Sequence, residues 1–192
     1  MDSISFNAKY VTNKYSVKAL SETKNKYWNK KVRLVKLDDQ SEDDCQVLQV
    51  LSKLWSKEEN FIDAILAKLL YRRCKKDAPK SDIYFLTTQK KTFKLLDPKK
   101  ILGIAEVTTI DKTSSFDYVQ ARPDSTYGKS HRKYTGVGDV LTKYVIKKFG
   151  RNNLYGHTIE DKIPFYERHG FVVVQRNIMN PLIKYKPDLV KK

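Results

Sequence analysis

The apolar positions of this chain follow two different periods in turn. Apolar residues at every second position, or a short apolar run between turn residues, predict a strand, whereas a spacing of three to four positions predicts a helix. Strand patterns cover residues 32–37, 82–88, 101–110, 116–121 and 153–158. Helical patterns cover residues 42–74 as two consecutive helices, and another covers residues 139–149. The chain is therefore predicted to combine helices and strands throughout its length.

The order of these elements favours an α/β (α+β) domain with a mixed, mostly antiparallel sheet flanked by helices. Only a short polar link separates the strands at 101–110 and 116–121, which predicts an antiparallel pair. The 192 residues fit a single domain, which we place at residues 32–192. Residues 1–31 are predicted to be a basic N-terminal extension whose alternating apolar positions favour short strands.

The composition adds a strong positive charge to this picture. The 38 Lys and Arg residues exceed the 22 Asp and Glu residues, and 38 − 22 gives a net charge of +16. Such a charge favours anionic partners such as nucleic acid, a phosphorylated cofactor or an acidic protein. No run of about 18 apolar residues and no secretory signal pattern is present. We therefore expect no membrane span and a cytoplasmic location.

Metal and disulfide chemistry find little support in the sequence. Cys45 and Cys74 are the only two cysteines, and their spacing matches no metal-ligand motif. His131, His157 and His169 stand too far apart to indicate a local metal site. We therefore predict a protein without a bound metal.

A basic run that contains aromatic residues lies between Lys24 and Lys31. Tyr27 and Trp28 stand among its lysines, an arrangement that can hold a nucleic-acid backbone and stack on bases. The same run can equally be a loop that its aromatic side chains anchor to the domain. The sequence leaves both interpretations open.

The turn that precedes the last predicted helix is the first feature that indicates chemistry. It reads Lys133-Tyr134-Thr135-Gly136-Val137-Gly138 and follows a predicted strand that ends near Ala121. Glycines allow the backbone to approach a ligand closely, and the free N–H groups at a helix N-terminus favour anions. A basic Gly-x-Gly turn in this position is therefore a candidate phosphate site.

Two motifs together resemble the GNAT superfamily of N-acetyltransferases. Residues 133–138 are similar to its pyrophosphate-binding signature, Arg/Gln-x-x-Gly-x-Gly/Ala, with Lys133 in the first position. Residues 165–171 read Phe-Tyr-Glu-Arg-His-Gly-Phe and nearly repeat its later signature, Phe/Leu-Tyr-Glu-x-x-Gly-Phe. The two motifs stand in the family's order, and the resemblance covers about residues 101–175.

This resemblance implies acetyl-CoA as the cofactor. Its pyrophosphate would lie on the backbone N–H groups at the start of the helix, and its pantetheine arm would pair with a strand edge. The contacts that the resemblance implies are made by Val119, Gln120, Ala121, Lys133, Tyr134, Thr135, Gly136, Val137 and Gly138. It also implies direct transfer of the acetyl group from thioester to amine, without an acyl-enzyme.

The implied reaction needs one group that removes a proton and one that supplies a proton. An alkylamine with a pKa near 10.4 is protonated at neutral pH. Formation of the neutral, reactive amine then costs roughly 4 kcal/mol. Glu106 is the first candidate base, and Asp117 is the second because it shares strand parity with Val119 and Ala121. By the resemblance, Tyr166 protonates the departing thiolate.

Two functions from different classes remain open at this stage. The first is an enzyme that acetylates a primary amine, carried by a protein or by a molecule associated with nucleic acid, and that acts as a monomer or a homodimer. The second is a basic nucleic-acid-binding module that keeps the acyltransferase fold without turnover. The complete Tyr166 motif favours the enzyme.

Overall fold

The structure is a computed structural model, which describes residues 9–21, 23, 26–55, 62–74, 79–90, 96–126, 132–177 and 179–189. The strands are β1 (Lys9–Leu20), β2 (Tyr27–Lys36), β3 (Ser81–Thr87), β4 (Ile101–Ile110), β5 (Thr113–Ala121), β6 (Tyr134–Thr135), β7 (Asn153–His157), β8 (Phe171–Gln175) and β9 (Leu182–Tyr185). The helices are α1 (Glu42–Trp55), α2 (Ile62–Cys74), α3 (Val137–Phe149) and α4 (Ile163–Glu167).

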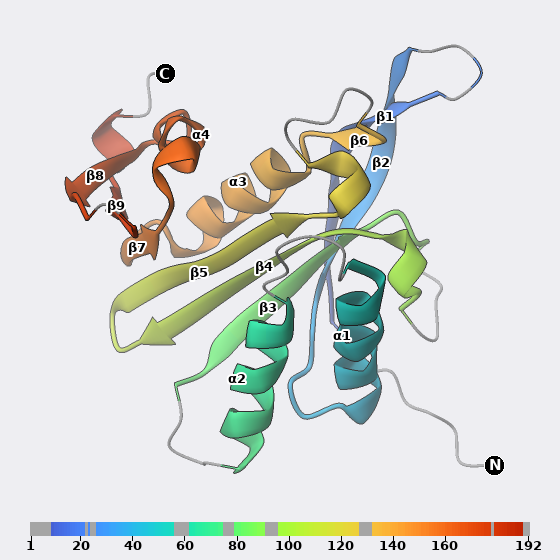
Figure 1. Cartoon of the computed structure of the whole chain (residues 1–192), viewed down its shortest axis with the longest axis horizontal. Coiled ribbons are helices and arrows are strands. Elements are labelled where there is room, and N and C mark those ends of the chain that lie inside the picture. The colour runs from blue at the N-terminus through green and yellow to red at the C-terminus, as the bar shows by residue number, and fades with distance from the viewer. Residues whose placement is uncertain are drawn as a thin grey trace.

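The strands form one twisted sheet in the order β6-β1-β2-β3-β4-β5-β7-β9-β8 (Figure 1). β5 and β7 pair in parallel, and every other pair within the described residues is antiparallel. The prediction of a mixed, mostly antiparallel sheet flanked by helices is confirmed. β2 crosses residue 31, so the described part of the N-terminal extension is built into this sheet.

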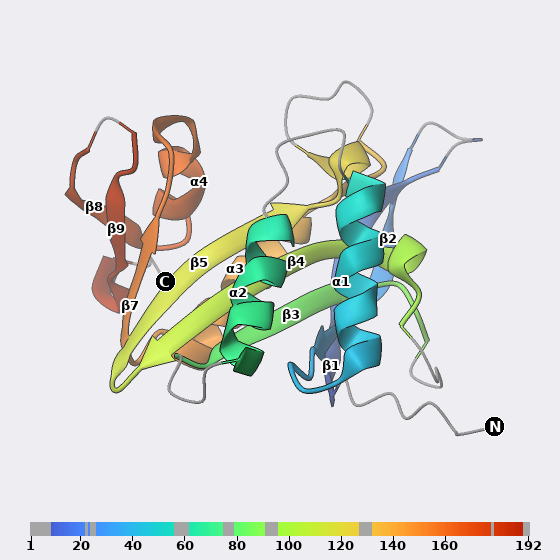
Figure 2. The ribbon, with the colours of Figure 1, turned by 60° about the horizontal axis from the view of Figure 1, so that its bottom comes forward.

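Helices cover both faces of the sheet, as Figures 1 and 2 show, with α1 and α2 on one face and α3 on the other. Alternation along the strands divides the apolar side chains between the two faces. In β3, Ile83 and Phe85 pack in the cluster with α1 and α2, whereas Tyr84 and Leu86 pack in the cluster with α3. The sheet is therefore buried on both sides at its centre.

α3 approaches β4 closely at Gly103. A β-carbon built on Gly103 would lie 2.5 Å from Cγ1 of Val137 and 2.9 Å from Cδ1 of Leu141. Both atoms belong to the first two turns of α3. The glycine therefore sets how closely the N-terminal end of α3 can approach the sheet.

We expect the Gly103→Ala change to lower the free energy of unfolding by about 1–3 kcal/mol, because the added methyl group overpacks this contact. Urea denaturation followed by circular dichroism measures the change. The matched control is the Gly103→Ala/Val137→Ala double variant, which removes the nearest clashing atom and should recover part of the loss. An unchanged denaturation midpoint for Gly103→Ala would contradict the prediction.

The described residues contain neither a candidate metal site nor a candidate membrane span. Within the described residues, no group of three or more His, Cys, Asp or Glu side chains is arranged to hold a metal ion. No helix in that part of the chain has the length and apolar character that crossing a bilayer requires.

Candidate active site

The candidate site begins where β5 and β7 separate. Their parallel pairing starts at Thr113 opposite Asn153 and ends at Phe116 opposite Gly156. β5 then continues to Ala121 along β4, while β7 turns to pair with β9. The two strands diverge beyond this last pair (Figure 1). Residues 117–121, which include the predicted pantetheine contacts Val119, Gln120 and Ala121, form the part of β5 that extends past β7.

The predicted phosphate turn leads directly into α3. Gly136 is the N-cap, with φ of +84°, a left-handed conformation that glycine adopts without strain. No side chain caps the helix, so the first-turn N–H groups, including those of Val137 and Gly138, face outward from its N-terminus. Together with the positive end of the helix dipole, these groups can hold a phosphate.

Gly138 has a packing role that the sequence pattern did not reveal. A β-carbon there would lie 3.3 Å from Cζ of Phe165 in α4. Beside it, His169 lies 3.2 Å from Asp139 through Nε2 and 2.8 Å from the carbonyl oxygen of Phe165 through Nδ1. The start of α3 is thus packed against the segment that carries the second family motif.

The remaining residues of the phosphate turn are held by the N-terminal hairpin. Tyr134 and Thr135 form β6, which pairs with Ala19 and Lys18 of β1. The N–H of Leu20 donates to the carbonyl oxygen of Lys133 at 2.9 Å. The sequence does not predict this strand, because two residues are too short to show a period. In the segment that leads from β5 to this turn, residues 127–131 lie outside the described residues.

Glu106 and Asp117, the two candidate bases, lie close together through a β-bulge. Along β4 and β5, Glu106 is opposite Tyr118 and Val107 is opposite Phe116, so Asp117 is the extra residue of β5. The bulge changes the strand parity, and Asp117 therefore faces α2. The parity argument, which placed Asp117 on the face of Val119, is corrected by this bulge.

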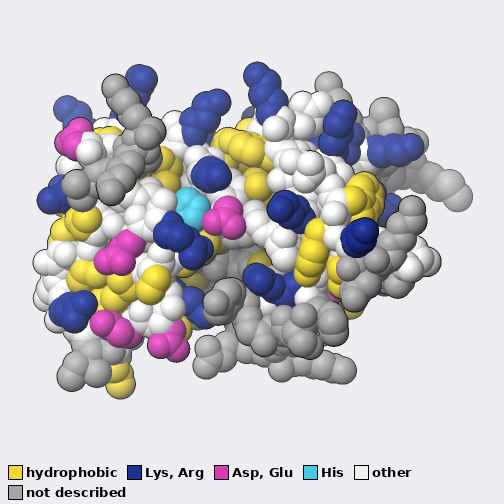
Figure 3. Space-filling view, turned by 90° about the horizontal axis from the view of Figure 1, so that it is seen from above, with side chains coloured by type: hydrophobic (Ala, Val, Ile, Leu, Met, Phe, Trp, Pro, Cys, Tyr) yellow, Lys and Arg dark blue, Asp and Glu magenta, His cyan; other side chains and the backbone are white. Residues whose placement is uncertain are grey.

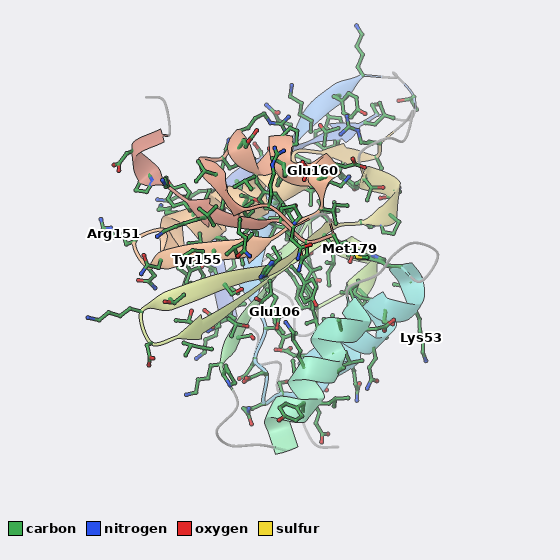
Figure 4. The ribbon with its side chains drawn as sticks, turned by 60° about the vertical axis from the view of Figure 1, so that its left-hand side comes forward. Lys53, Glu106, Arg151, Tyr155, Glu160 and Met179 are labelled. Atoms are coloured by element: carbon green, nitrogen blue, oxygen red, sulfur yellow. The ribbon has the colours of Figure 1, made fainter. Side chains whose placement is uncertain are left out.

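Lys68 of α2 joins the two carboxylates. Its Nζ lies 3.3 Å from Oε2 of Glu106 and 3.4 Å from Oδ2 of Asp117, and 4.7 Å from the ring centre of Tyr118. Thr108 also donates a hydrogen bond to Asp117 through its hydroxyl, at 2.5 Å. Figure 4 shows Glu106 on β4 at the side of the sheet that α2 covers. The sequence pattern does not indicate a functional role for Lys68. Its only signal was a lysine beside the buried stripe of a helix.

The charges of this cluster are unevenly compensated. Burial raises the pKa of Glu106, whose side chain is 0% exposed, and the nearby Lys68 ammonium only partly opposes this effect. Burial lowers the pKa of Lys68, but the charges of Glu106 and Asp117 together outweigh burial and raise it. The site therefore holds a firmly protonated amine and a carboxyl group with increased proton affinity.

Tyr166 lies on the other side of β5. Its ring packs edge-on against Phe116, with 6.2 Å between the centres, and against Phe171, at 5.6 Å. Burial raises the pKa of Tyr166 to about 12, so the phenol stays protonated at physiological pH. Its hydroxyl makes no hydrogen bond to another described residue. Tyr166 is therefore a protonated phenol next to the last paired residue of β5.

The fold described above is that of the GNAT N-acetyltransferases. A putative GNAT-family acetyltransferase from Desulfovibrio desulfuricans matches with a TM-score of 0.52 and 16% identity, over 80% of this chain and 96% of its own. The ribosomal-protein-S18-alanine N-acetyltransferase from Escherichia coli matches with a TM-score of 0.52 and 10% identity, over 80% of this chain and 92% of its own. The PaiA N-acetyltransferase from Thermoplasma acidophilum was solved in complex with coenzyme A. It matches with a TM-score of 0.50 and 13% identity, over 81% of this chain and 98% of its own.

The fold that the resemblance of the two motifs implied is thus confirmed. The sequence itself matches no family model and no curated protein. At identities of 10–16%, these structures establish the arrangement of the helices and strands only. The chemistry of the site has to be inferred from the residues of this chain.

Proposed function

We propose that this protein is an N-acetyltransferase that transfers the acetyl group of acetyl-CoA directly to a primary amine. The observation that carries the proposal is the divergence of β5 from β7 at Phe116. At one end of the diverging segment, Val137 at the uncapped start of α3 packs on Gly103, which pairs with Ala121. At the other end, Tyr166 packs against Phe116. Among the similar structures, the PaiA protein was solved with coenzyme A.

The residues of this chain fit the cofactor. The N–H groups at the start of α3 can hold its pyrophosphate, and β5 from Val119 to Ala121 can pair with an extended pantetheine arm. Acetyl-CoA supplies an activated acetyl thioester to this site. The fit rests on backbone groups, which explains how the site can persist at low sequence identity.

The two proton transfers use residues on opposite faces of β5. On the α2 face, Glu106 or Asp117 accepts a proton from the acceptor ammonium, and burial raises the pKa of Glu106. On the α3 face, Tyr166 donates its proton to the departing sulfur. Neither cysteine is needed, because the transfer is direct.

Calorimetric titration with acetyl-CoA at low and moderate salt tests the proposal, followed by thiol release with a panel of primary amines. We expect a Kd in the micromolar range that persists at moderate salt, and thiol release that requires an amine. Absence of binding at both salt concentrations would rule out the acetyl-CoA-dependent enzyme.

A nucleic-acid contact is the second candidate function, and the β1–β2 hairpin favours it. Tyr27 is 44% exposed and Trp28 is 49% exposed, while Nζ of Lys30 lies 4.9 Å from the Trp28 ring centre. The hydroxyl of Tyr27 also donates to the carbonyl oxygen of Arg132, at 2.9 Å, so the hairpin lies beside the phosphate turn. Lys and Arg side chains are spread over the face seen in Figure 3.

Tryptophan fluorescence can detect stacking on this hairpin directly. The chain has two tryptophans, and Trp55 is only 3% exposed, so quenching by a ligand reports on Trp28. If bases stack there, oligouridylate should quench the emission and heparin, a polyanion without bases, should not. The Trp28→Ala change should weaken oligouridylate binding about 5- to 150-fold, measured by anisotropy.

Tyr71→Ala is the matched control, because Tyr71 is an exposed aromatic residue on α2, away from the hairpin. It should bind oligouridylate like the unchanged protein. If heparin quenches as strongly as oligouridylate, or if Trp28→Ala and Tyr71→Ala lose the same affinity for oligouridylate, binding depends on charge alone and not on base stacking.

A further inference from the structure

Lys68 places a primary amine of this chain inside its own candidate site. The Nζ atom lies within 3.4 Å of a carboxylate oxygen of both Glu106 and Asp117, and above the ring of Tyr118. These residues include both candidate bases that the sequence predicted. An acceptor ammonium entering between the carboxylates would make the contacts that Lys68 makes here.

The position of this amine along β5 coincides with the point where the strands separate. Asp117 and Tyr118, which contact Lys68, directly follow Phe116, the last residue paired with β7. Tyr166 packs against Phe116 from the opposite face of the sheet. The amine of Lys68 and the ring of Tyr166 thus lie on the two sides of the same short stretch of β5.

We propose that Lys68 is an internal acceptor, acetylated by the acetyl-CoA that this same chain binds when no external amine is present. The inference rests on the proposed function. The Lys68 ammonium loses one proton to Glu106 or Asp117. The nitrogen lone pair then forms an N–C bond to the thioester carbonyl carbon, the C–S bond breaks, and the sulfur takes the proton of Tyr166. The nitrogen loses its second proton, which restores the Tyr166 phenol through solvent, and the proton held by the carboxylate passes to solvent. The products are Nε-acetyl-lysine, coenzyme A with a free thiol, and one proton released to solvent.

Electrostatics predict a consequence of this modification. In the unmodified protein, the Lys68 ammonium offsets the repulsion between Glu106 and Asp117. An acetylated Lys68 is neutral and no longer occupies the carboxylates as a cation. Self-acetylation therefore removes an internal competitor from the subsite that an external ammonium would use.

Mass spectrometry tests the assignment without any knowledge of the natural acceptor. The purified protein is incubated with acetyl-CoA labelled with ¹³C in the acetyl group, in the absence of other amines, and then digested. We expect Lys68 to gain the label in a first-order process whose rate constant does not depend on protein concentration. This rate should exceed those of Lys143 and Lys147, exposed on α3, by about 100-fold or more.

Two variants separate catalysis at the site from ordinary chemical reactivity. Glu106→Gln/Asp117→Asn should slow labelling of Lys68 at least about 10-fold while acetyl-CoA still binds. Because this double variant removes buried charges, Lys68→Arg serves as a second test that retains a cation between the carboxylates. The intact Lys68→Arg protein should lose the fast labelling phase completely.

The outcomes distinguish this inference from the proposed function. Labelling of Lys68 at the rate of Lys143 and Lys147, in a protein that binds acetyl-CoA, would overturn the internal-acceptor assignment and leave the enzyme intact. A rate that rises with protein concentration, or a fast phase that remains in Lys68→Arg, would also overturn it. Failure to bind acetyl-CoA at all would overturn both.

Discussion

Replacement of Tyr166 by phenylalanine is expected to lower kcat for acetyl transfer by about 100- to 1,000-fold, within the range for loss of a general acid. The hydroxyl is the group removed, and burial keeps its pKa at about 12, so it is a neutral donor throughout the physiological range. The phenylalanine ring preserves the packing against Phe116, Phe165 and Phe171. The Kd for acetyl-CoA should therefore remain within about twofold.

Single-turnover thiol release, with acetyl-CoA bound in advance and a primary amine added, measures this effect on the chemical step. Tyr185→Phe is the matched control, because the Tyr185 ring packs in the same aromatic cluster, 5.5 Å from the centre of Phe171. It should retain nearly full activity. If Tyr166→Phe loses no more activity than Tyr185→Phe, the departing sulfur does not depend on Tyr166 for its proton.

Long periodic elements of this fold were predictable from sequence because their pattern reports burial directly. β4 was predicted with the bounds that it has, since its first seven residues are all buried between two helical layers. α1 and α3 were recognisable from one apolar stripe each. The fold class followed from the order of such elements, which propensity and period determine locally.

The contacts between distant segments were not predictable in the same way. β6 exists because β1, more than a hundred residues earlier, offers a pairing edge, and no local pattern records that partner. The bulge at Asp117 shifts the face of one side chain without altering the apolar pattern of β5. Lys68 reaches Glu106 only through the packing of α2 on the sheet.

The same distinction between local patterns and contacts of distant segments applies to the candidate site. The phosphate turn and Tyr166 belong to contiguous motifs, so sequence alone located them. The cluster around Glu106 is assembled from α2, β4 and β5, and its third member, Lys68, became visible only in three dimensions. The packing role of Gly138 against Phe165 likewise depends on a contact between two helices.

A glutamate at position 136 is expected to weaken acetyl-CoA binding by at least about 100-fold, because it places a negative charge beside the phosphate site and a side chain on a left-handed residue. No atom lies within 4 Å of a β-carbon built there, so a local clash does not explain the loss. Asparagine tolerates this backbone conformation and carries no charge, which makes Gly136→Asn the matched control, expected within about threefold of the unchanged protein. Calorimetric titration compares the three proteins. Equal affinities for Gly136→Glu and Gly136→Asn would show that the phosphates bind elsewhere.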